Sequence, residues 1–228
     1  KMNARGKPLT DFETFKARFE QQLRDLYPIE KREIGDASLP VHDFFSRRMD
    51  TRWTDFFWSY RTPTTTVFDE AVINLFWIVA WVSITPDNRA TGVSVAKYRQ
   101  AIRNYSAFHE LGLLTRAFAD NLICLLEVWS AGGGKLEPQL PEPRYFDEAD
   151  FFTKASTSPE SIQYSELVLF AAFVSYLNVN ESALDAAEFQ EWMRVVFNLV
   201  QNSDIERPDE YERCLSGLAK LLPHSRQI

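Results

Sequence analysis

The sequence predicts an all-α fold, an irregular bundle of about eight to ten helices. Apolar residues recur at three- and four-residue spacing along most of the chain, and capping or turn residues delimit the segments. No segment shows a convincing alternation of apolar and polar residues, so no strand is expected. Of the 228 residues, 45% are hydrophobic and 14% are aromatic. A chain of this length and composition can bury a large core.

The first helices are marked by their ends. Thr10 and Glu13 have the spacing of a capping box, and the helix that they start is expected to end before Tyr27. A second helical stretch begins at Leu39-Pro40 and runs to about residue 60, with a break and a new cap at Asp50. Residues 61–66, with a proline among threonines, form a connector.

Three helices are expected in the middle of the chain. The segment from about residue 67 to Ser83 is apolar almost all round, which predicts a helix at the centre of the core. Ser94 is expected to cap a short helix that extends to Tyr105. A long helix from about Ala107 to Ser130 then carries one apolar stripe and stops at three consecutive glycines.

The last helices follow a Gly- and Pro-rich stretch, residues 132–144, that we interpret as a hinge or an exposed loop. They are expected at 148–155 after an Asp147 cap, from Pro159 or Ser161 to about 177, at 185–201, and from Pro208 to about 222. Residues 1–62, a helical segment after an N-terminal loop, and residues 63–228, a helical bundle, are expected to pack as one domain.

Charge disfavours a nucleic-acid binder driven by overall electrostatics, since the net charge is −7 and the isoelectric point about 5.1. Arg47, Arg48 and Arg52 nevertheless form a small basic cluster between aromatic residues, as a groove for single-stranded nucleic acid would. The alternative, which an acidic chain favours, is a face whose arginines form intramolecular salt bridges. Burial of Trp53 and Trp58 would favour the structural alternative, and their exposure beside the arginines would favour nucleic acid.

The sequence predicts no catalytic residue and no metal site. The histidines His42, His109 and His224 are scattered, and Cys124 and Cys214 lie far apart with no Cys-x-x-Cys spacing. No apolar run reaches the roughly 20 residues that a bilayer crossing needs, and no secretory signal is recognisable at the N-terminus. We therefore expect a cytoplasmic protein with no membrane partner.

One short segment is not explained by packing. Asn3, Arg5, Gly6 and Lys7 lie on a loop directly before the capped helix. Exposed amides, two cations and the positive end of the helix dipole favour an anion at such a place. A glycine turn with surface charges is the alternative.

The same segment carries a family resemblance. Asn3-x-Arg5-Gly6-Lys7-Pro8-Leu9-Thr10 resembles the element that closes the nucleotide-handling N-terminal domain of GmrSD-type restriction endonucleases and related phage-defence proteins. The Trp-Thr-Asp-Phe-Phe-Trp element at 53–58 and the segments 164–171 and 192–200 are similar to later elements of that family. The resemblance is collinear over about residues 1–222. Because the chain begins inside the motif, we expect it to be part of a longer polypeptide.

The resemblance implies that separate domains carry the catalytic functions. In that family the N-terminal domain is similar to a ParB/sulfiredoxin-type fold that hydrolyses nucleoside triphosphate through an Asp-Gly-Gln-Gln-Arg motif, and many members carry a C-terminal His-Asn-His nuclease domain. Neither motif occurs in this sequence. The chain then corresponds to the helical middle, without a cofactor of its own. NTP with a divalent metal, and DNA, would be bound by the full-length protein.

By the same resemblance, Asn3, Arg5, Gly6 and Lys7 would contact or orient the nucleotide, and the partners would be the NTPase domain and a nuclease domain. The expected function is a helical scaffold and interaction region of a bacterial NTP-dependent, modification-sensing DNA restriction protein, inactive alone. Two alternatives stay open. One is an enzyme fragment that keeps part of an NTP site through Arg5 and Lys7; the other is a helical protein-interaction domain with no nucleotide role.

Overall fold

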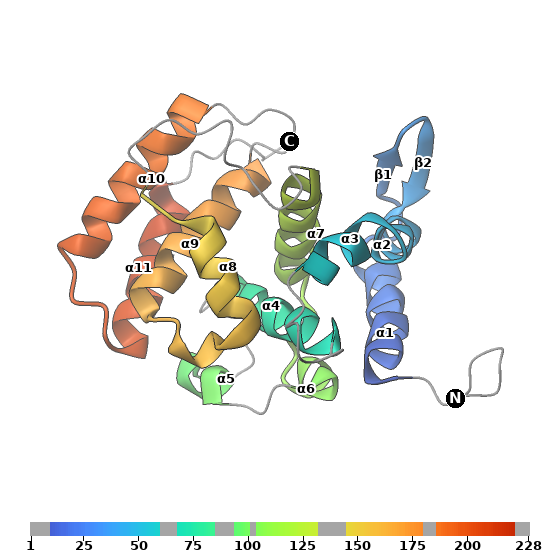
Figure 1. Ribbon diagram of the computed structural model, residues 1–228, viewed down its shortest axis with the longest axis horizontal. Coiled ribbons are helices and arrows are strands. Elements are labelled where there is room, and N and C mark those ends of the chain that lie inside the picture. The colour runs from blue at the N-terminus through green and yellow to red at the C-terminus, as the bar shows by residue number, and fades with distance from the viewer. Residues whose placement is uncertain are drawn as a thin grey trace.

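The computed structural model describes residues 10–59, 68–84, 94–100, 104–131, 145–179 and 186–221. Within these ranges the chain forms eleven α-helices, a short 3₁₀ helix and a two-stranded antiparallel sheet (Figure 1). The prediction of an all-α, multi-helix bundle is confirmed. The helix count exceeds the expected eight to ten because one of the predicted long helices is interrupted.

The N-terminal helices follow the predicted boundaries. α1 (Asp11–Leu26) starts at the Thr10 capping box and ends at Tyr27. α2 (Val41–Met49) and α3 (Arg52–Ser59) are separated at Asp50, where the sequence indicated a break. α1 packs against α2, and α2 packs against α3.

A hairpin between α1 and α2 corrects the expectation that no strand would form. β1 (Lys31–Ile34) pairs with β2 (Ala37–Pro40), with Ile34 opposite Ala37. Gly35 has a φ of 57°, as the first central residue of a type II′ turn requires. Strands of four residues are too short to show a clear alternation, so the Gly-Asp pair at the turn was the signal that sequence reasoning missed.

α4 (Phe68–Ser83) lies at the centre of the molecule (Figure 1). Every residue from Val72 to Ile84 is buried, which confirms the prediction of a helix that is enclosed on all sides. α4 packs against α3, α7, α8 and α9. The N-terminal and C-terminal helices therefore share a central element.

The long helix predicted at 107–130 is wrong. α5 (Val95–Gln100) follows Ser94, whereas α6 (Tyr105–Glu110) has its own cap, because Asn104 Oδ1 accepts from the Ala107 amide at 2.8 Å. Gly112, with a φ of 65°, follows α6, and α7 (Arg116–Ala131) begins afterwards. The apolar spacing continues across this break, which is why periodicity alone suggested one helix.

The C-terminal helices agree with the sequence apart from one start. They are α8 (Glu148–Thr157), the 3₁₀ helix η2 (Pro159–Ser161), α9 (Tyr164–Val179), α10 (Ala186–Gln201) and α11 (Pro208–Leu221). Asp147 caps α8 by accepting from the Asp150 amide at 2.9 Å. The helix expected from Pro159 or Ser161 begins later, because η2 occupies those residues. α9 packs against α7, α10 and α11.

The core contains two groups of phenylalanines. The N-terminal aromatic cluster joins α1, α2, α4, α6 and α7, with ring centroids 4.9–6.4 Å apart, through Phe15, Phe19, Phe45, Phe76, Phe108 and Phe118. The C-terminal aromatic cluster joins α8, α9 and α10, with centroids 4.5–6.4 Å apart, through Phe146, Phe151, Phe170, Phe173 and Phe189. Both belong to one continuous group of buried residues.

Candidate functional site

The predicted nucleotide-contacting residues Asn3, Arg5, Gly6 and Lys7 lie outside the described residues, which begin at Thr10. The helix that follows them is described. Thr10 Oγ1 accepts from the Glu13 amide at 3.1 Å, and Glu13 Oε2 accepts from the Thr10 amide at 2.8 Å.

This capping box affects the anion prediction. Two amides at the N-terminus of α1 donate to side chains of the same turn, and the acidic residues Asp11 and Glu13 lie at the positive end of the helix dipole. An anion bound at this place would have to be attracted mainly by the loop cations, Arg5 and Lys7. The prediction for the loop therefore depends on its arginine and lysine more than on the helix.

The three arginines of the basic cluster have different environments. Arg47 is exposed and Arg52 is half-buried. Arg48 Nη2 donates to Glu127 Oε2 of α7 at 2.7 Å, and the Arg48 guanidinium lies 5.4 Å from the centroid of the Phe44 ring. One of the three thus forms the intramolecular ion pair that the alternative interpretation requires.

Trp53 completes this contact. Its side chain is fully buried, and its indole Nε1 donates to Glu127 Oε1 at 3.0 Å. Glu127 therefore accepts one hydrogen bond on each oxygen, and we call Arg48, Trp53 and Glu127 the Glu127 joint. Trp53 is structural by the criterion of burial, whereas the Trp58 side chain lies outside the described residues. Nucleic-acid binding by Arg47 and Arg52 stays a prediction.

A second polar contact fastens the end of α1 to the start of α7. Tyr27 Oη donates to Asp120 Oδ1 at 2.7 Å, and the Arg116 guanidinium lies 4.6 Å from the Tyr27 ring centroid. Arg116 Nη2 also donates to Glu30 Oε1 at 2.9 Å. Burial, together with the hydrogen bond to Asp120, raises the pKa of the Tyr27 hydroxyl well above its usual value. We call these four residues the Tyr27 joint; sequence reasoning gave no signal for it.

Three helices of the core are connected by polar side chains. Asn121 Nδ2 donates to Ser83 Oγ at 2.9 Å, and Asn178 Nδ2 donates to Asn121 Oδ1. These residues come from α7, α4 and α9. Since a partly buried amide is costly without partners, such a contact fixes the register of the helices more than it creates a reactive group.

A pocket of about 360 Å³ lies between the end of α10 and α11. Its lining includes apolar and acidic residues together with Arg213 and a thiol: Leu199, Asp204, Ile205, Glu210, Cys214 and Gly217. Burial raises the pKa of the Cys214 thiol, which disfavours the nucleophilic thiolate.

Metal ligands do not gather in the described part of the chain, where no group of three His, Cys, Asp or Glu side chains could hold an ion. Cys124 is buried and Cys214 is half-buried, and both are free thiols. Among the helices of the described residues, none has the length and apolar character needed to cross a membrane.

Comparison with known proteins found no match to a protein-family model, to a curated protein or to a solved structure.

Proposed function

We propose that this chain is the helical scaffold and interaction region of an NTP-dependent, modification-sensing DNA restriction protein, of the type that its N-terminal motif resembles, and that it is inactive alone. The observation that supports the proposal best is the direct connection between the motif and the core. Residues 3–9 lead into α1 at Thr10, and Phe15 and Phe19 of α1 belong to the N-terminal aromatic cluster.

α1 is held at both ends, so it could transmit a displacement at its N-terminus to the core. Its N-terminus is fixed by the capping box, and its C-terminal end is held to α7 by the Tyr27 joint. Between them, Phe15 packs on Phe76 of α4 and Phe108 of α6, at 5.6 and 5.3 Å between centroids. A displacement of the loop would therefore be passed to the central helices, because packed cores transmit strain.

The polar groups of the described residues fit a scaffold. The Arg48 and Glu127 side chains, and likewise Tyr27 and Asp120, are engaged with one another across helices. Such contacts set the orientation of the helices and leave no free pair of acid and base at these joints. On this proposal, the chemistry is supplied by the NTPase and nuclease domains, and the helical region relays the nucleotide or DNA state between them.

NTP hydrolysis tests the proposal. It would be measured for this chain, for the full-length gene product, and for the full-length product with Arg5→Ala. The matched control is Arg18→Ala, which removes the same charge from an exposed position of α1. We expect hydrolysis only in the full-length product, lost with Arg5→Ala and retained with Arg18→Ala, while thermal unfolding of both variants is unchanged.

Two results would contradict the proposal. Hydrolysis by this chain alone would indicate that it is an enzyme. Absence of hydrolysis in every form, including the full-length product, would favour a helical interaction domain with no nucleotide role.

A further inference from the structure

We propose that the pocket between α10 and α11 binds a basic peptide segment of a partner protein, with an arginine or lysine side chain inserted between the two helices. The pocket is formed by residues far in sequence from the N-terminal motif, and its physical basis does not depend on the family that the motif resembles.

The floor of the pocket is apolar and has room for a side chain. Leu199 of α10 and Ile205 of the connecting loop face Cys214 and Gly217 of α11 across a space of about 360 Å³. A Cβ atom at Gly217 would have no heavy atom within 4 Å, so open space lies beside this residue. An alkyl stem of three or four carbons can be buried against such a surface while its charged end stays at the rim.

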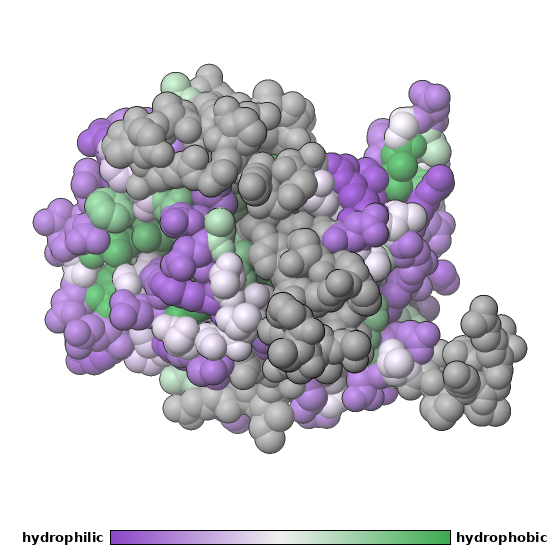
Figure 2. Space-filling view, in the orientation of Figure 1, coloured by the Kyte–Doolittle hydropathy of each residue, from purple (hydrophilic) through white to green (hydrophobic). Residues whose placement is uncertain are grey.

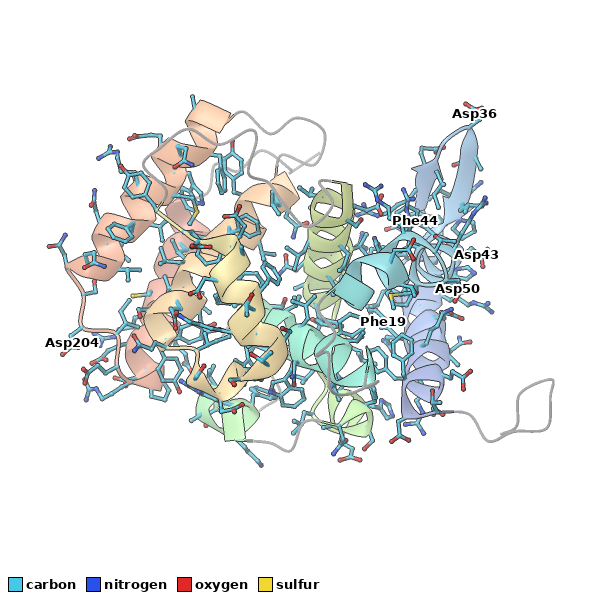
Figure 3. All side chains as sticks on the ribbon, in the orientation of Figure 1. Phe19, Asp36, Asp43, Phe44, Asp50 and Asp204 are labelled. Carbon is cyan, nitrogen blue, oxygen red and sulfur yellow. The ribbon has the colours of Figure 1, made fainter. Side chains whose placement is uncertain are left out.

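The rim is acidic. Between residues 204 and 213 the chain carries five carboxylates and two arginines, of which Asp204, Glu210 and Arg213 line the pocket. The Asp204 side chain is exposed, and Figure 3 places it at the edge of the molecule, on the loop between α10 and α11. Arg207 is paired with Glu210, and Arg213 lies 3.9 Å from Asp209, but five carboxylates against two arginines leave the stretch with a net charge of −3. This net charge attracts a cation and repels phosphate or nucleic acid.

The acidic wall is already held in place. Glu210 Oε2 accepts from the amides of Glu206 and Arg207 at 3.1 and 3.0 Å, and Arg207 Nε donates to Glu210 Oε1 at 2.8 Å. These hydrogen bonds hold the pKa of Glu210 below its usual value, so the carboxylate stays charged. The bond from the Arg207 side chain has the largest effect. A site whose charges are ordered before binding costs less to complete.

One exposed apolar side chain lies on α10 one turn from the pocket lining. Val195, one turn before Leu199, is 40% exposed. Figure 2 shows apolar surface surrounded by hydrophilic residues on the side of the molecule formed by α10 and α11. An apolar pocket floor, a neighbouring exposed valine and an acidic rim together match a peptide in which basic and apolar residues alternate, because each part of the surface then meets its complement.

Binding of fluorescein-labelled acetyl-Leu-Arg-Gly-Leu-Arg-Gly-amide, followed by fluorescence anisotropy, tests this proposal. The comparison peptide has glutamate in place of both arginines. We expect saturable binding of the arginine peptide alone, weakened as salt is raised. Asp204→Asn should weaken it about three- to fivefold. Gly217→Leu, which fills the pocket, should abolish it.

The control for charge is Asp36→Asn, the same substitution at the tip of the hairpin, which Figure 3 shows on the other side of the molecule. It should leave the affinity unchanged. Equal weakening by Asp36→Asn and Asp204→Asn would mean nonspecific attraction by an acidic protein and would overturn the proposal. So would absence of binding, retention of full affinity by a folded Gly217→Leu, or preference for a single-stranded RNA oligonucleotide of the same length. If Gly217→Leu does not fold, the difference in peptide affinity between Asp204→Asn and Asp36→Asn still tests the proposal.

Discussion

The N-terminal helices and the C-terminal helices are attached to the centre of the molecule by different contacts. α1–α3 combine the N-terminal aromatic cluster with two polar joints, in which Arg48 meets Glu127, and Tyr27 meets Asp120, across 79 and 93 residues of sequence. α10 and α11 contact α9 mainly through rings, with Phe189 5.8 Å from Phe173, and α10 adds one hydrogen bond, which Trp192 Nε1 donates to the Ala172 carbonyl at 3.0 Å.

Ion pairs of α10 and α11 include local ones, which join Glu191 to Arg194 and Arg207 to Glu210 three residues apart, and Arg213 to Asp209 four residues apart. A local pair stabilises its own helix, whereas a pair between distant segments fixes how two helices are oriented. The N-terminal attachment is therefore directional, whereas the C-terminal attachment is mainly apolar. A helix that transmits a displacement needs directional contacts of the kind found at the N-terminal helices.

The largest expected effect tests whether the two regions unfold together. Phe19→Ala and Phe170→Ala each remove a fully buried ring, one from each aromatic cluster, and should each cost about 3–5 kcal/mol. Because the buried residues form one continuous group, we expect both variants to unfold in a single transition, measured by urea denaturation with circular dichroism and tryptophan fluorescence. Two separate transitions in either variant would show that the regions are independent.

The Glu127 joint gives the next largest effect. Glu127→Ala leaves the fully buried Trp53 indole and the partly buried Arg48 guanidinium without their acceptor, and should cost about 2–3 kcal/mol. This loss in the free energy of unfolding is measured by urea denaturation. Glu191→Ala is the control, since it removes a carboxylate from an exposed local pair and should leave the midpoint unchanged. Similar losses in the two variants would mean that the joint is no stronger than a surface pair.

Features formed by residues close in sequence were predictable, whereas contacts between residues distant in sequence were not. The helix starts at Thr10, Asp147 and Pro208 were predictable, because a cap is formed by residues within three positions of one another. Arg48 was recognised as part of a basic cluster, but its partner Glu127 could not be, because nothing in a single sequence indicates which helices pack together.

The missed hairpin and the break in the long helix have the same cause. The hairpin was missed because two strands of four residues are defined by pairing with each other and not by their own pattern. The break at Gly112 was missed because the apolar stripe continues in register on both sides of it. Of the predicted nucleotide site, only the helix that follows Asn3, Arg5, Gly6 and Lys7 is described, with its capping box as predicted.

The hydroxyl groups of Tyr27 and Tyr211 are expected to contribute differently to stability, by a smaller amount than the Glu127 joint. Tyr27→Phe removes the hydrogen bond to Asp120 and should cost about 1–2 kcal/mol by urea denaturation. Tyr211 is fully buried on α11, and no hydrogen-bond partner for its hydroxyl is found among the described residues. Tyr211→Phe should therefore be neutral or slightly stabilising. A loss for Tyr211→Phe as large as that for Tyr27→Phe would remove the contrast between the regions.

The pH dependence of stability separates the two tyrosines from the rest of the chain. Burial raises the pKa of both hydroxyls in the folded protein, so the folded state keeps protons that the unfolded state releases near pH 10. Their contribution to stability is complete below about pH 10 and is lost as the pH rises above it. We expect the fall in unfolding midpoint between pH 9 and 11 to be shallower in Tyr27→Phe and in Tyr211→Phe than in the wild type. An unchanged slope in both variants would contradict the assignment.

The smallest effect concerns two glycines with opposite roles. Gly217→Ala in α11 should stabilise the protein by about 0.5–1 kcal/mol, because the helix gains a better helix-forming residue and the new Cβ has no heavy atom within 4 Å. Gly112→Ala should destabilise it by about 1 kcal/mol, because its φ of 65° is unfavourable for any residue with a Cβ. The two Tm values should move in opposite directions. A stabilising Gly112→Ala would mean that α6 and α7 can join into the single helix that their apolar spacing suggests, with the N-terminal aromatic cluster rearranged around it.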